Sequence, residues 1–76
     1  MASELVTLPA APAEDVLTRL LAGEPLAELT ARRGQDAAGR ERVQIMVTHP
    51  DPEVVAGARQ ALLRRCQAER VRAFVV

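Results

Sequence analysis

Several residue types are missing from this chain or occur only once. It has no lysine, tryptophan, tyrosine or asparagine, and it has one phenylalanine, one cysteine and one histidine. A lone aromatic side chain, Phe74, cannot build a stacking platform for single-stranded nucleic acid or a cage for a cation. One cysteine excludes an internal disulfide, and one cysteine with one histidine excludes a zinc site of four such ligands. We therefore expect no metal and no other cofactor.

Long apolar runs are also missing. No stretch approaches the roughly 20 apolar residues that a membrane-spanning helix needs. The first residues, Met1 to Glu4, lack the basic segment with which a secretory signal begins. We expect a cytoplasmic protein without a membrane partner.

What the chain does contain is typical of one small globular domain. Its 76 residues, 49% apolar and 26% charged, fit a single domain over residues 1–76. Ten arginines balance ten acidic residues, so net charge favours no polyanionic partner. The charge is uneven, because residues 1–31 hold five acids and one arginine, whereas residues 32–76 hold nine arginines and five acids. We expect these opposite charges to pair within the fold.

The first half of the chain predicts one strand followed by two helices. Residues 4–8 favour a strand that stops at Pro9. A helix is expected from Pro12 to a glycine cap at Gly23, and a shorter helix from Pro25 to Arg33. The segment 34–40, with two glycines and no apolar periodicity, is expected to be a loop.

The second half predicts a strand, a long helix and a last strand. Residues 42–48 alternate between apolar and more polar side chains, as a strand with one buried face does. Asp51 and Pro52 are typical of a helix start. The helix that follows carries an apolar stripe of Val55, Ala58, Leu62 and Cys66, and residues 70–76 are expected to form a third strand.

The resulting order, β-α-α-β-α-β, predicts a two-layer α/β domain. Strands that alternate with helices favour a small three-stranded, mainly parallel sheet with the helices on one face. An all-α domain of four helices is the alternative.

The alternation in the second and third strands predicts an interaction surface. If Val43, Ile45 and Val47 face the helices, other side chains lie on the open side of the sheet. That surface consists of Gln44, Met46, Arg72, Phe74 and Val76. Apolar residues on an open face indicate a partner, and a small core gains stability from assembly. We expect a non-enzymatic, regulatory interaction module that binds a second copy, through this face or an edge strand, or a larger protein.

Other side chains are weaker candidates for a site. In a parallel sheet, Thr7, Thr48 and His49 would share a rim at the carboxyl ends of the strands, where ligands bind. Cys66 is expected to be a buried, unreactive thiol on the apolar stripe. No pair of titratable groups has a catalytic spacing, so we expect no catalytic residue.

One segment suggests a different function. Residues 20–34 resemble the first two helices of transposase-type helix-turn-helix domains. That resemblance implies a DNA-binding regulator built on residues 25–47. Its phosphate contacts would be Arg32, Arg33, Arg40 and Arg42.

Overall fold

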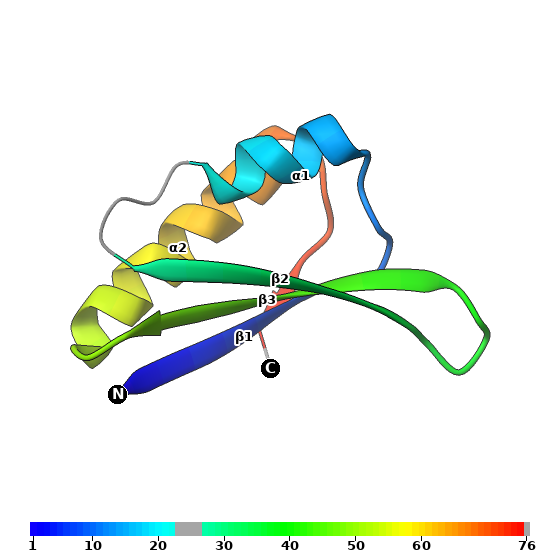
Figure 1. Cartoon of the computed structure of the whole chain (residues 1–76). Helices are drawn as coiled ribbons and strands as arrows, with labels where there is room; N and C mark the ends of the chain where they lie inside the picture. Colours follow the sequence, from blue (N-terminus) through cyan, green and yellow to red (C-terminus); the bar gives the residue numbers. More distant parts are fainter. Residues whose placement is uncertain (23–26, 76) are drawn as a thin grey trace.

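The computed structural model describes residues 1–22 and 27–75, which form four strands and two helices in the order β-α-β-β-α-β. The colours of Figure 1 follow the chain from the N-terminus to the C-terminus. The elements are β1 (Ala2–Leu8), α1 (Glu14–Leu21), β2 (Glu28–Gln35), β3 (Glu41–His49), α2 (Pro52–Ala68) and β4 (Phe74–Val75). The hairpin of β2 and β3 extends beyond the helices (Figure 1).

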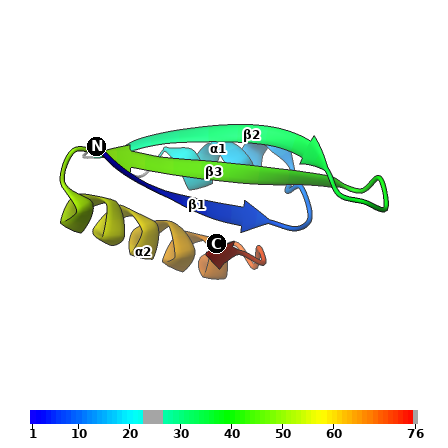
Figure 2. The same ribbon diagram turned by 90° about the horizontal axis from the view of Figure 1, so that it is seen from below.

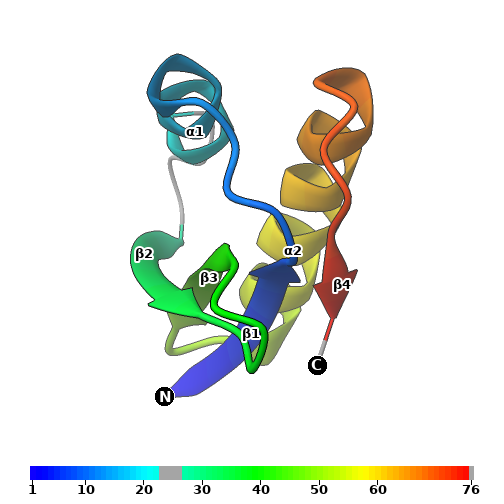
Figure 3. The ribbon, with the colours of Figure 1, turned by 90° about the vertical axis from the view of Figure 1, so that its right-hand side faces the viewer.

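The strands form one antiparallel sheet in the order β2-β3-β1-β4. Both β1 and β2 run antiparallel to β3, so they are parallel to each other with β3 between them. This is the split β-α-β arrangement of the ferredoxin-like topology. Both helices pack on one side of the sheet, as the end-on view in Figure 3 shows. In Figure 2, seen from the other side, no helix lies in front of the strands.

The predicted α/β class and the single helical layer are confirmed, but the three-stranded, mainly parallel sheet is wrong. The strand over residues 41–49 does not continue a parallel β-α-β unit from β1. It folds back from β2 as a hairpin and inserts beside β1 in antiparallel register. The all-α alternative is wrong as well.

The missing strand is β2, where a helix from Pro25 to Arg33 was expected. Gly23, Pro25 and Leu26 lie outside the described residues, but Glu28–Gln35 is a strand that pairs with β3 along its whole length. Leucine, alanine, glutamate and arginine are among the residues with the highest helix propensity, but differences in propensity are small and tertiary pairing overrides them.

The turn that joins β2 to β3 explains the antiparallel register. Asp36 Oδ1 accepts hydrogen bonds from the backbone N–H groups of Ala38 and Arg40, both at 2.9 Å. The hydrogen bond from Arg40 and, to a smaller extent, the one from Ala38 lower the pKa of the Asp36 carboxyl group. Gly39 takes a φ of 79°, which glycine adopts without steric cost. The expected loop over residues 34–40 is therefore a tight hairpin turn, and residues 34 and 35 still belong to β2.

The core lies between the sheet and the two helices. Alternate residues of β1 and β3 point into it, and the predicted stripe of α2 packs against them, which confirms both patterns. The buried residues are Val6, Leu8, Val43, Ile45 and Val47 from the sheet, Leu17, Leu20, Val55, Ala58, Leu62 and Cys66 from the helices, and Ala27 just before β2.

The two ends of α2 differ in how well the sequence predicts them. Asp51 caps the start as expected, and its Oδ1 accepts the N–H of Glu53 at 2.9 Å. At the other end, Val71 N–H donates to the carbonyl of Cys66 and Arg70 N–H to that of Gln67, a Schellman motif. This motif uses the residues where the last strand was expected to begin, so β4 is only Phe74–Val75.

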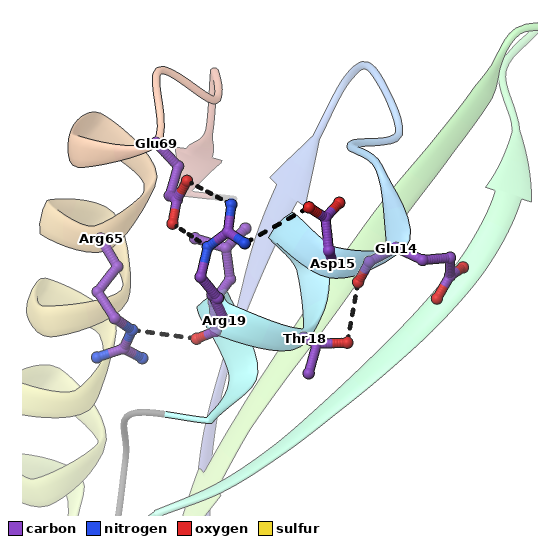
Figure 4. Close-up of polar contacts among 7 residues, drawn as sticks. Glu14, Asp15, Thr18, Arg19, Arg65 and Glu69 are labelled. Carbon is purple, nitrogen blue, oxygen red and sulfur yellow. Dashed lines mark hydrogen bonds and ion pairs between the residues drawn. The ribbon is translucent and has the colours of Figure 1, made fainter.

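Ion pairs tie the helices to each other and to the sheet. Arg19 of α1 donates to Glu69 at the end of α2, with Nε–Oε2 at 2.7 Å, and also lies 3.5 Å from Asp15 (Figure 4). Two further ion pairs join a helix to the sheet. Glu4 of β1 pairs with Arg59 of α2, with Oε2 and Nη1 2.8 Å apart, and Glu14 of α1 pairs with Arg33 of β2. The acidic first part of the chain is thus partly neutralised by arginines from the rest, as expected.

Candidate interaction surface

The side of the sheet that faces away from the helices is the candidate site, called the open face below. Its residues alternate with the buried ones, so their side chains point to the opposite side. They are Ser3, Leu5 and Thr7 of β1, Glu28, Thr30 and Arg32 of β2, Arg42, Gln44, Met46 and Thr48 of β3, and Phe74 of β4. Among the described residues, no segment covers them (Figure 2).

Met46 occupies the centre of the open face. Leu5 of β1 and Thr30 of β2 are its cross-strand partners on either side. With Arg32 and Gln44 these residues line a shallow hollow of about 370 Å³. Met46 remains 38% exposed although Leu5 and Thr30 flank it. Methionine is flexible and polarizable, which suits a surface that adapts to a partner's side chain.

The next cross-strand row is longer and more polar. Arg32, Gln44 and Thr7 lie side by side on the three long strands, and Phe74 continues the row on β4. Phe74 is 52% exposed, and the guanidinium carbon of Arg72 lies over its ring, 5.7 Å from the centroid. This cation–π contact orients Arg72 beside the open face.

Charge on the open face is strongly one-sided. Arg32 and Arg42 of the open face, and Arg72 beside it, form no ion pair with a described residue, because every ion pair of the described chain involves other arginines. Among the described residues, the only carboxylate of this face is that of Glu28, which lies opposite Thr48, whereas Arg42 lies opposite Gly34 near the other end of β2. A protein without net charge thus presents a basic, partly apolar patch.

The structure brings together most of the residues predicted for this surface. Gln44 and Met46 lie at its centre, Phe74 lies beside Thr7, and Arg72 stacks on Phe74. Val76 lies outside the described residues. The prediction missed two neighbours of Met46, Leu5 and Thr30, because cross-strand partners follow from the register of the strands. Residues 4–8, Glu-Leu-Val-Thr-Leu, do not alternate strictly, so the sequence gives no clear signal for the side of Leu5.

The predicted rim of Thr7, Thr48 and His49 is wrong. Because β1 and β3 are antiparallel, their carboxyl ends lie at opposite ends of the sheet. Thr7 pairs with Gln44, whereas Thr48 pairs with Ser3. His49 instead closes the turn before α2, where its Nδ1 accepts the N–H of Asp51 at 3.0 Å.

The helix-turn-helix over residues 25–47 is wrong too, because its described part consists of β2, the hairpin turn and most of β3. Its four arginines do not share one surface. Arg33 points to the helix side, where it pairs with Glu14 and Glu41, and Arg40 pairs with Asp36 in the turn. Arg32 and Arg42 lie on the open face.

Cys66 is buried as expected, with 1% of its surface exposed. Burial raises the pKa of its thiol, and nearby Arg65 lowers it by a smaller amount. The described residues include no group of three or more His, Cys, Asp or Glu side chains that could hold a metal ion. Neither described helix is long and apolar enough to cross a membrane.

Comparisons with known proteins provide no relative from which a function could be transferred. No family model matches the chain, and neither a curated protein sequence nor a solved structure matches it.

Proposed function

We propose that this chain is a non-catalytic protein-interaction module whose open face binds an acidic segment of a partner protein. One observation carries this proposal. The side of the sheet that no described helix covers combines an apolar centre, Leu5 and Met46, with Arg32 and Arg42 on the face and Arg72 at its edge, none of which has a carboxylate partner among the described residues.

The charge of the open face favours an acidic partner over a second copy packed face to face. Two such faces would bring Arg32, Arg42 and Arg72 of each copy against one another, and like charges at an interface are costly. Arginine side chains bind carboxylates with paired hydrogen bonds, which gives both affinity and orientation. A segment with spaced carboxylates matches the pattern of these three residues.

The apolar centre favours a protein segment over a nucleic acid. The hollow beside Met46 and Leu5 suits one aliphatic side chain of an extended peptide, while neighbouring carboxylates reach the arginines. Single-stranded nucleic acid instead binds platforms on which successive bases stack. This face offers one aromatic ring, Phe74, at its edge.

A labelled probe peptide of four Glu-Ser-Leu-Ser repeats tests the proposal, because residues two apart point to the same side of an extended chain, so its carboxylates and leucines can contact the open face together. We expect fluorescence anisotropy to show saturable binding that weakens as salt is added, since exposed charges are screened. Met46→Ala and Arg72→Gln should each weaken binding at least about fivefold.

Arg64→Gln is the matched control, because Arg64 is an exposed arginine on α2, away from the open face. It removes the same charge and should leave the affinity unchanged. The proposal fails if the wild-type protein does not bind the peptide, or if Arg64→Gln weakens binding as much as Arg72→Gln. Tighter binding of a single-stranded oligouridine of equal charge would favour a nucleic-acid ligand and contradict it as well.

A further inference from the structure

The edge of the sheet formed by β2 is a second feature without a partner in the described chain. With the strand order β2-β3-β1-β4, the two edges are β2 and β4. The described β4 is two residues long, whereas β2 has eight. A long, regular edge strand offers a row of backbone groups to another strand. We infer that β2 pairs antiparallel with β2 of a second copy, in the register that places Glu28 opposite Arg32.

The hairpin turn shows which backbone groups of β2 are free. Asp36 N–H donates to the carbonyl of Arg40 at 2.9 Å, so these residues form a hydrogen-bonded pair. Hydrogen-bonded pairs alternate with non-hydrogen-bonded ones along an antiparallel ladder. The backbone groups of residues 28, 30, 32 and 34 therefore point toward β3. Those of Leu29, Ala31, Arg33 and Gln35 point to the free edge.

These free groups restrict how two copies can pair. A two-fold axis perpendicular to the sheet keeps the helices of both copies on the same side, so residues of the open face lie opposite residues of the open face. Hydrogen-bonded pairs then form between the outward-directed residues of each strand. The remaining choice is the residue on which the axis lies.

Charge and apolar burial select an axis at Thr30. This register places Glu28 opposite Arg32 of the second copy on both sides of the axis, as non-hydrogen-bonded pairs, in which side chains come closest. On the helix side, Leu29 lies opposite Ala31 of the second copy. Both of these side chains already pack partly against the core, so the pairing would bury them further.

Neighbouring registers lack this match. An axis at Ala31 places Arg33 opposite Leu29 and leaves Glu28 opposite Gly34. An axis at Arg32 places two arginines directly opposite each other, which is destabilising. With the axis at Thr30, Arg42 and Arg72 of each copy stay available on a sheet that continues through both copies.

Sedimentation velocity of the full chain over a range of concentrations tests this inference. We expect a monomer–dimer equilibrium in the wild type. Glu28→Arg and Arg32→Glu should each raise the dimer dissociation constant at least about fivefold, because each creates two like-charged pairs per dimer. The double variant should restore the dissociation constant to within about threefold of the wild-type value. Arg64→Glu, with the same charge change on α2, should leave it unchanged.

Ala31→Pro provides a test that does not depend on charge. Proline is tolerated on an edge strand where the lost N–H faces solvent, so pairing with β3 should survive and circular dichroism should remain that of the wild type. We expect this variant to be monomeric. A wild-type chain that remains monomeric, a dimer that survives Ala31→Pro, or a dimer indifferent to the charge reversals would each overturn the inference.

Discussion

Ile45 and Met46 are consecutive residues of β3 that point to opposite sides of the sheet. Ile45 is completely buried against the helices, whereas Met46 is 38% exposed between Leu5 and Thr30. One strand thus contributes to the core with one set of side chains and to the open face with the other. Changes at these neighbouring positions should separate stability from binding.

Replacing Ile45 by alanine should destabilise the fold by about 3 kcal/mol, because it removes fully buried methyl groups and leaves a cavity. Met46→Ala should cost less than about 1 kcal/mol, since the side chain is already partly in water. Urea unfolding followed by circular dichroism measures both changes. Similar destabilisation by the two substitutions would contradict the assignment of Met46 to an uncovered face.

The ion pair of Arg19 and Glu69 should make stability depend on pH. Hydrogen bonds and charge from Arg19 lower the pKa of the Glu69 carboxyl group in the folded chain. As the pH falls, Glu69 therefore takes up its proton at a higher pH in the unfolded chain than in the folded chain. The stabilisation by the ion pair is complete above the ordinary glutamate pKa and is lost as the pH falls through the lowered pKa of the folded chain. The free energy of unfolding, measured from about pH 7 to about pH 3, should fall more steeply in the wild type than in Arg19→Gln.

Arg64→Gln serves as the control for this experiment, because it removes an arginine that makes no ion pair with a described residue. The lowered pKa of Asp36, held by the turn, contributes equally to all three proteins and cancels in their differences. If Arg19→Gln and Arg64→Gln show the same pH dependence, the pair of Arg19 and Glu69 does not contribute in solution.

Arg70 adopts a left-handed backbone conformation, with φ at 57°, in the motif that ends α2. Side chains with a Cβ atom are strained there by roughly 1–2 kcal/mol, and glycine is not. Glycine loses more conformational entropy on folding, which offsets part of the relieved strain, so Arg70→Gly should stabilise the protein by about 0.5–1 kcal/mol. Arg64→Gly, inside the same helix, should destabilise it by about 1 kcal/mol. Thermal unfolding would refute the assigned backbone if Arg70→Gly were the more destabilising change.

The buried thiol of Cys66 should weaken the fold at high pH. Burial raises its pKa, so the unfolded chain ionises at lower pH than the folded chain. The stabilisation by the buried Cys66 side chain is complete below the thiol pKa of the unfolded chain and is lost as the pH rises toward the higher thiol pKa of the folded chain. The difference in unfolding free energy between wild type and Cys66→Ala should therefore shrink from about pH 7 to about pH 10. A constant difference, or rapid alkylation of the folded protein by iodoacetamide, would show that the thiol is accessible.

Local patterns predicted the fold where one face of an element is buried. The alternation around Ile45 identified β3 and both of its faces, and Asp51 with Pro52 marked the start of α2. An edge strand is different, because β2 contributes few apolar side chains to the core, so its sequence shows no strong alternation. Its conformation comes from pairing with β3 through the turn at Asp36 and Gly39, and that turn also decides that the sheet is antiparallel.

The candidate surface could be predicted along each strand but not across strands. Gln44, Met46 and Phe74 followed from alternation alone. Their neighbours Leu5 and Thr30 follow only from the register, which a single sequence does not encode locally. The rim of Thr7 and His49 failed for the same reason, since it assumed parallel strands.

The proposal that the open face binds an acidic protein segment is tested most directly by titrating methyl-labelled protein with the Glu-Ser-Leu-Ser peptide in NMR spectra. We predict saturable shifts of the Met46 and Leu5 methyl signals, while the signals of Ile45 and Leu62, on the opposite side of the sheet, remain in place. Shifts that are largest on α2, or no saturable shift at Met46 and Leu5, would contradict the proposed function.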